Sequence, residues 1–295
     1  MRTLYRACLG LSALCATAAA IAQDVPDDQS SPIVVTGRKD MEQRIRAFAD
    51  TLQDARGLDQ IGRFEVQGVC PAALGIVDQQ QREVKARMRL VARTVGIPVA
   101  GAKCTPNALV VVTDDKRAFI ERLEKSRPYW FVSLSVPAVR RLARSPGPAA
   151  VWHVEGTLNG DGMDLGVRDY YGASSVNNSF HAPSLITAAT RPHFNAGIVV
   201  LDIRALEGLS TTQLADYAAM RIFAPTDPAK LAAPYATTII RILDAPRGTA
   251  VPLSLTHWDV GLLKGLYSAR DNLYTGSQKN EIRKQIEQEL RTVKR

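Results

Sequence analysis

The sequence predicts an α+β or α/β fold, in which a single main domain has a mixed sheet packed with helices. Two runs dominated by β-branched and other aliphatic residues, 109–113 and 198–202, are typical of strands that are buried on both faces. Longer segments have apolar residues three or four positions apart, the spacing of helices that pack on a core. Asn159-Gly160-Asp161-Gly162 is a strong signal for a β-hairpin. Strands and helices alternating in this way favour a sheet covered by helices.

The first 22 residues have the features of a secretory signal peptide. Arg2 and Arg6 give a positive start, and residues 9–21 are apolar but too short to span a bilayer comfortably. Small residues precede the Ala22–Gln23 bond, so we expect cleavage there. A buried N-terminal helix is the alternative. No later segment is long and apolar enough for a membrane span, so we expect a periplasmic or secreted protein.

The chain is mildly basic. Its 37 Lys and Arg residues and 29 Asp and Glu residues give a formal net charge of +8, and loss of Arg2 and Arg6 with the signal leaves +6. This charge is compatible with anionic glycans, lipids or nucleic acid and identifies none of them. We expect an envelope protein or ligand as the partner, and no nucleic acid.

Two cysteines, Cys70 and Cys104, remain after the signal is removed. An exported chain with two cysteines favours one disulfide, and two buried free thiols are the alternative. The disulfide would close a loop of about 35 residues and would contribute roughly 3–4 kcal/mol on the chain-entropy model.

Residues 23–39 are expected to form a flexible leader that includes a short strand, Ile33-Val34-Val35-Thr36-Gly37. This strand resembles the opening segment of the plug domains of TonB-dependent outer-membrane receptors. The resemblance implies an accessory role in a TonB-linked envelope system. Because the chain lacks the long alternating strands of a barrel, a simple edge strand is the favoured interpretation.

The main domain is expected to span residues 40–277. Its first elements are, in order, a helix at 40–56 capped by Asp40, a strand at 63–69, a helix at 78–95 with a stripe of Val84, Met88, Val91 and Val95, and strands at 97–100 and 109–113. Asp114 and Asp115 follow the last of these strands directly. Acidic side chains there could bind a metal, but capping of a helix at 116–125 is favoured.

The middle of the domain contains an aromatic connector, a short helix and the hairpin. The expected elements are a core plug at 128–131, a helix at 135–142, a strand at 150–158, the turn at 159–162 and a long loop at 170–192. The acidic turn residues also suggest calcium, but no matching Glu follows at the required spacing.

The last part of the domain alternates strands and capped helices. The expected elements are a strand at 198–202, a helix at 211–223 capped by Ser210 or Thr211, an extended run at 238–243, a helix from Thr256 to Tyr267 and, as a separate segment, a charged amphipathic helix at 278–295.

Residues 198–267 resemble the catalytic half of metzincin-like zinc peptidases. Residues 211–223 take the place of the active-site helix and 238–243 that of the segment after it, while Leu255-Thr256-His257-Trp258-Asp259 resembles the start of the closing helix. The resemblance implies a zincin-like scaffold.

The chain departs from that family where its chemistry resides. A zincin needs two His residues one helical turn apart and a Glu that activates water. The segment Gln213-Leu214-Ala215-Asp216-Tyr217 supplies neither, and no GxSxG elbow or phosphate-binding Gly-rich loop occurs elsewhere. We therefore expect no catalytic residue, no metal and no cofactor.

Five polar residues are the candidates for a binding surface: Gln213, Asp216 and Tyr217 on the central helix, and His181 and His193 in or beside the long loop. Purely structural roles for Asp216 and Tyr217 are the alternative. We expect a non-catalytic periplasmic binding scaffold on a degenerate metallopeptidase-like fold. A hydrolase with an unrecognised site near residues 170–195 and the TonB-linked accessory are the other hypotheses.

Overall fold

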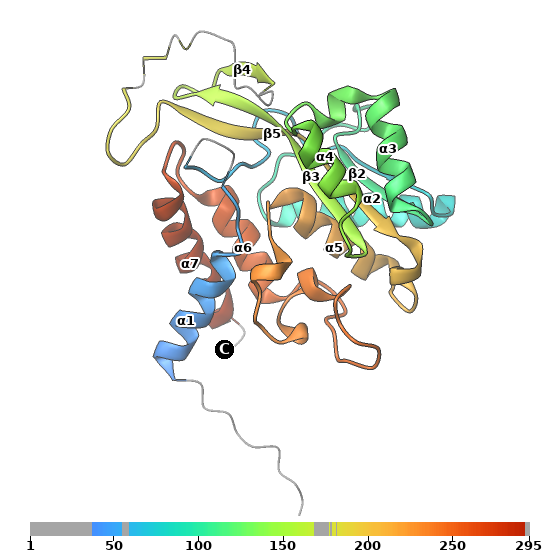
Figure 1. Ribbon diagram of the computed structural model, residues 1–295. Helices are drawn as coiled ribbons and strands as arrows, with labels where there is room; N and C mark the ends of the chain where they lie inside the picture. The colour runs from blue at the N-terminus through green and yellow to red at the C-terminus, as the bar shows by residue number, and fades with distance from the viewer. Residues whose placement is uncertain (1–36, 55–58, 168–176, 178, 181, 293–295) are drawn as a thin grey trace, which may run out of the picture. The chain divides into compact units, whose positions relative to one another are not determined.

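The computed structural model describes residues 37–54, 59–167, 177, 179–180 and 182–292, which form an α+β domain around one mixed sheet (Figure 1). The predicted fold class is confirmed. The strands are β1 (Pro71–Leu74), β2 (Ala108–Thr113), β3 (Ala149–Asn159), β4 (Asp164–Val167) and β5 (Thr190–Asp202). The α-helices are α1 (Arg38–Ala49), α2 (Asp78–Thr94), α3 (Lys116–Ser126), α4 (Val136–Ala143), α5 (Thr211–Phe223), α6 (His257–Ser268) and α7 (Thr275–Thr292).

The sheet has the strand order β1-β2-β5-β3-β4. β1, β2 and β5 run parallel, with Val110 opposite Val199 in the pairing of β2 and β5. β3 runs antiparallel to β5, and β4 returns antiparallel to β3 after the predicted turn. β5 is therefore the central strand of the described sheet.

Helices cover both faces of this sheet. Val199 and Leu201 of β5 pack into a large core together with α1, α2, α5, α6 and α7. Their neighbours Ile198 and Val200 point to the other face, where α3, α4 and the 3₁₀ helix η1 (Pro128–Phe131) enclose a smaller core. The alternation follows from the period of two in a strand. None of the helices in the described ranges is both long and apolar enough to cross a membrane.

Most of the expected helix starts are present. Asp115, Ser135 and Ser210 each accept a hydrogen bond from a backbone N–H in the first turn of α3, α4 and α5. Thr256 and Asp259 form a reciprocal capping box at the start of α6. Asp115 is thus a helix cap, which was the favoured interpretation of Asp114 and Asp115. The cap expected at Asp40 is wrong, because α1 begins at Arg38 after Gly37.

Several predicted strands are misplaced. Residues 63–69 and 97–100 form only isolated bridges at Arg63, Val69 and Val99, and the strand starts at Pro71 instead. A proline can begin β1 because β1 lies at the edge of the sheet. The expected strand at 198–202 is only the end of β5, which starts at Thr190.

The extended run predicted at 238–243 is also wrong. The segment contains a 3₁₀ helix, η5 (Ile239–Arg241), because Thr238 caps it through the N–H of Ile240. The buried carboxylate of Asp259 accepts hydrogen bonds from the Thr238 hydroxyl and from the N–H of Ile239 (3.0 Å). A contact made 20 residues away along the chain therefore overrides the β-branched sequence pattern.

The C-terminal helix α7 is part of the domain and not a separate segment. Ile282 and Ile286 are fully buried where α7 packs against α6. Two glycines of α6 permit this close contact, since a Cβ at Gly265 would lie 2.7 Å from the Cα of Ile282. The expected boundary at 277/278 falls inside α7.

Substitution of Gly265 by Val should destabilise the protein. The added side chain meets backbone atoms of α7 that cannot move without separating the helices, so we expect a loss of about 3 kcal/mol, at the upper end of overpacking effects. Urea unfolding measures it. Gly276→Val is the matched control, because a Cβ at Gly276 meets nothing within 4 Å. Equal stability of the two variants would contradict the packing described.

Candidate functional site

A cavity of about 730 Å³ lies between α2, the start of β1 and the loop of residues 97–107. Three cationic side chains of α2, Lys85, Arg89 and Arg93, line it together with the disulfide and apolar residues such as Val99. They are four residues apart and so project from one side of the helix. We call this cavity the basic pocket.

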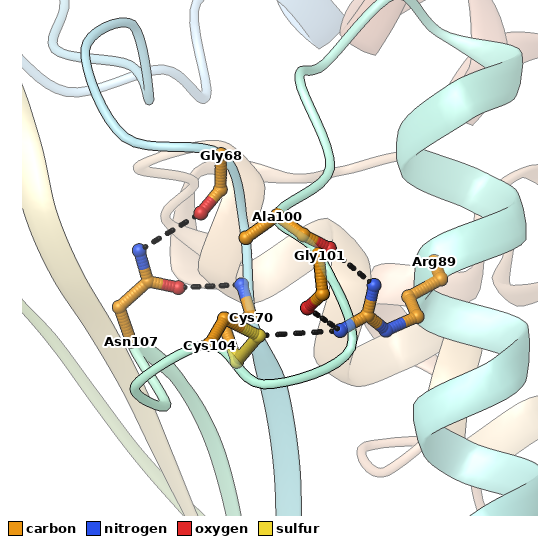
Figure 2. The surroundings of a disulfide bond; sticks show 7 residues. All are labelled: Gly68, Cys70, Arg89, Ala100, Gly101, Cys104 and Asn107. Carbon is orange, nitrogen blue, oxygen red and sulfur yellow. Dashed lines mark hydrogen bonds between the residues drawn. A yellow bond between two sulfur atoms is a disulfide. The ribbon is translucent and has the colours of Figure 1, made fainter.

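The disulfide holds the wall of the basic pocket in place (Figure 2). Cys70 and Cys104 are bonded, which confirms the predicted pairing. The Cys70 N–H donates to Asn107 Oδ1 (2.7 Å), and Asn107 Nδ2 donates to the Gly68 carbonyl (3.3 Å). Gly68 is required there, since a Cβ would lie 2.6 Å from the Ala100 nitrogen. The loop is therefore fixed by covalent and hydrogen bonds on both sides.

Arg89 is oriented by this loop. Its guanidinium donates to the carbonyls of Ala100 (2.6 Å) and Gly101 (3.3 Å) and contacts the Cys104 sulfur at 3.3 Å. None of these partners is charged, and no Asp or Glu is among the residues that line the pocket. The positive charge of the pocket is consequently not neutralised by the described residues that form it.

The described lining of the basic pocket combines three cationic side chains with apolar groups and contains no His, carboxylate or hydroxyl side chain. Cations combined with an apolar wall suit an anionic group attached to an apolar one.

The predicted residues of α5 lie inside the domain and not on a surface. Gln213, Asp216 and Tyr217 are 5%, 0% and 3% exposed. Gln213 completes the cap of α5 and donates to the Pro252 carbonyl (2.8 Å). Burial raises the pKa of Tyr217, whose ring lies 5.9 Å from the Arg221 guanidinium. The sequence suggested a binding surface at these residues, but the packing of α5 inside the domain removes them from solvent.

Asp216 connects three segments. Its carboxylate accepts two hydrogen bonds from Arg87 of α2 (2.6 and 2.9 Å), one from the Ser254 hydroxyl (2.8 Å) and one from the Leu255 N–H (2.9 Å). Oδ1 accepts one of these bonds and Oδ2 accepts three, so both oxygens of this fully buried carboxylate are hydrogen-bonded within the protein. This is the structural alternative considered for Asp216.

His193 is also buried, at 1% exposure on β5. Burial lowers its pKa, while Asp164 lies 3.4 Å from Nε2. Its Nδ1 has no hydrogen-bond partner among the described residues. Several predicted features lie outside those residues: the Ala22–Gln23 bond, the strand residues Ile33 to Thr36, and positions 170–176, 178 and 181 of the expected loop, the last of which is His181.

A metal site is not formed by the side chains that can be placed. Within the described ranges, no three His, Cys, Asp or Glu side chains come together in a way that could hold a metal ion.

The sequence analysis did not identify the cations of the basic pocket as a site. They lie on α2 opposite the apolar stripe, where charged residues are normally only the solvent-exposed side of a helix. The available signal was their recurrence at four-residue spacing near two cysteines, but the pocket forms only when the 97–107 loop folds over α2.

Comparisons of the chain with protein-family models, curated proteins and solved structures found no match. The metzincin-like resemblance thus stays a prediction, and the function has to be inferred from the site.

Removal of the Asp216 carboxylate should lower the unfolding free energy of the whole protein. Asp216→Ala leaves Arg87 without its buried partner, and loss of one member of such a pair costs about 3–5 kcal/mol; partial exposure of Arg87 places this variant near 3 kcal/mol. Urea unfolding is the measurement. Glu207→Ala, which breaks an exposed pair with Arg247, should change stability by less than about 0.5 kcal/mol. A small effect for Asp216→Ala would show that the carboxylate is not a structural anchor.

His153 should make the protein less stable in acid. Its ring stacks on Phe194, its Nε2–H donates to the Ile222 carbonyl (2.9 Å), and burial lowers its pKa from 6.5 to about 4. Between pH 6.5 and about 4, His153 is therefore protonated in the unfolded chain but stays neutral in the folded chain. Stability should fall by up to about 3 kcal/mol between these values.

The His153→Gln variant tests this by its slope. Between pH 6.5 and 4, the unfolding free energy of the unaltered protein should decrease with acid more steeply than that of the variant. Burial raises the pKa of Asp259 to about 6, which has the opposite effect over part of this range, so only the difference between the two proteins is informative. Parallel profiles would be incompatible with a His153 that stays neutral in the folded protein. Substitution of the exposed His257 by Gln is the control.

Proposed function

We propose that this chain is a non-catalytic binding protein of the cell envelope, and that its ligand is a small anion with an apolar part bound in the basic pocket. The main support is the charge of that pocket, where three cations of α2 line a space that no acidic side chain lines. A concave surface lined by one sign of charge with apolar walls concentrates the opposite charge. Its volume of about 730 Å³ is within the range of small-molecule sites.

Export is supported by two features. The N-terminal segment has the charge and apolar pattern of a secretory signal. The Cys70–Cys104 disulfide, which forms a wall of the basic pocket, persists in oxidising compartments and is rare in the cytosol. The ligand is therefore expected among the anionic small molecules of the envelope.

The proposal predicts binding of naphthyl phosphate, which joins an aromatic ring to a phosphate, at low salt. Lys85→Met with Arg93→Met should weaken it at least tenfold, since each removed cation takes away a charge-assisted hydrogen bond worth about 1.5–3 kcal/mol. These two side chains make no bond to the 97–107 loop, so the wall of the pocket stays intact. Titration calorimetry gives the affinities.

Lys103→Met is the matched control. Lys103 is exposed beside Cys104 and does not line the pocket, so its removal should leave the affinity within about twofold. Equal loss in both variants, or no binding by the unaltered protein, would reject the pocket as the site. The same ligand reports turnover, because hydrolysis releases fluorescent naphthol. Release of naphthol at the pocket would replace the binding role by an enzymatic one.

A further inference from the structure

The layer formed by α3, η1 and α4, residues 116–148, contains most of the excess positive charge of the protein. It has eight Lys and Arg residues and two Glu residues, a net charge of +6, against +8 for the whole chain. A segment of about one ninth of the sequence thus accounts for most of the basic character.

This charge lies on the outer surface of the layer. Lys116 is buried and donates to the carbonyls of Ser145 (2.7 Å) and Gly147 (2.6 Å). The other seven cations are exposed: Arg117, Arg122, Lys125, Arg127, Arg140, Arg141 and Arg144. In the described part of the chain, Arg117 pairs with Glu121 and the remaining six form no ion pair.

The inner surface holds the layer rigidly on the sheet. Ile120, Val139 and Phe131 are buried, and the Phe131 ring stacks on Trp152 of β3 with centroids 5.0 Å apart. The Trp152 indole N–H donates to the Trp130 carbonyl (2.7 Å). The outer cations are therefore displayed on a fixed surface and not on a mobile tail.

Apolar side chains are exposed among these cations. Tyr129 is 55% exposed two residues after Arg127, and Val136 is 56% exposed one helical turn before Arg140 on α4. An aromatic ring with a polar tip suits the boundary between water and lipid, where the basic side chains around it meet phosphate groups.

We propose that the outer surface of the α3–α4 layer binds the anionic surface of a lipid bilayer. Unpaired arginines give the long-range attraction to acidic headgroups, while Tyr129 and Val136 add contacts that a hydrated acidic polymer does not offer. The basic pocket belongs to α2, which packs on the opposite face of the sheet, so the two proposals rest on different surfaces.

Vesicle sedimentation tests this with the full chain and three matched sets of variants. Vesicles contain phosphatidylglycerol and phosphatidylcholine in about a one-to-two ratio, or phosphatidylcholine alone. The test variant is Arg122→Gln with Arg127→Gln and Arg140→Gln. Its control is Lys39→Gln with Lys230→Gln and Lys284→Gln, three exposed lysines on α1, on the 3₁₀ helix Pro228–Lys230 and on α7. The third set replaces Tyr129 and Val136 by Ser.

We expect binding to the anionic vesicles only, and loss of this binding as salt increases. Each basic residue near such a surface changes partitioning by about fivefold, so the arginine variant should bind at least tenfold more weakly and the lysine control should bind unchanged. The serine variant should bind more weakly at high salt, where the electrostatic part is screened. Urea midpoints verify that all variants are folded.

Three results would overturn the proposal. One is equal loss in the arginine and lysine sets, which would mean unspecific attraction by net charge. Another is binding to dextran sulfate with no binding to either vesicle, which would assign the surface to an acidic polymer. The third is absence of binding to anionic vesicles at low salt by a protein that still binds naphthyl phosphate, which would leave the pocket proposal standing alone.

Discussion

The central strand β5 is buried on both faces and hydrogen-bonded on both edges, and the remaining elements are arranged around this constraint. Val199 and Leu201 face one core, and Ile198 and Val200 face the other. Such a strand can satisfy its backbone only between neighbouring strands, and its side chains only beneath two layers of helices. The position of β2 on one side and β3 on the other follows from this requirement.

Two buried carboxylates complete the larger helical layer. Asp216 connects α5 to α2 and to the segment before α6, and Asp259 connects the start of α6 to η5. Residues 224–256 have little regular structure, so their backbone groups need partners from elsewhere. These two side chains accept such bonds, which is why polar residues occur at fully buried positions of otherwise apolar helices.

The sequence predicts the elements whose signal is local. Helix caps at Asp115, Ser135 and Ser210 and the turn after β3 depend on residues a few positions apart. β5 before Ile198 was not recognisable, because Pro192 and His193 lack strand character and are held by pairing with β3 and by a bridge from His193 to Arg63. The basic pocket requires a disulfide loop folded over α2, and a helical stripe of cations alone does not distinguish a site from a solvated surface.

The acidic and basic groups of this fold differ in how completely they are paired. Asp216 has four protein donors and Asp259 accepts from two hydroxyls and two backbone N–H groups, so every oxygen of these two fully buried carboxylates is hydrogen-bonded within the protein. Arg89, Arg122 and Arg140 form no ion pair within the described part of the chain. In this protein, the polar residues of α5, the helix that resembles an active-site helix, are therefore a weaker guide to function than cations that have no acidic partner. By that criterion, we expect both proposed surfaces to bind anions, whereas the helix that resembles an active-site helix is part of the core.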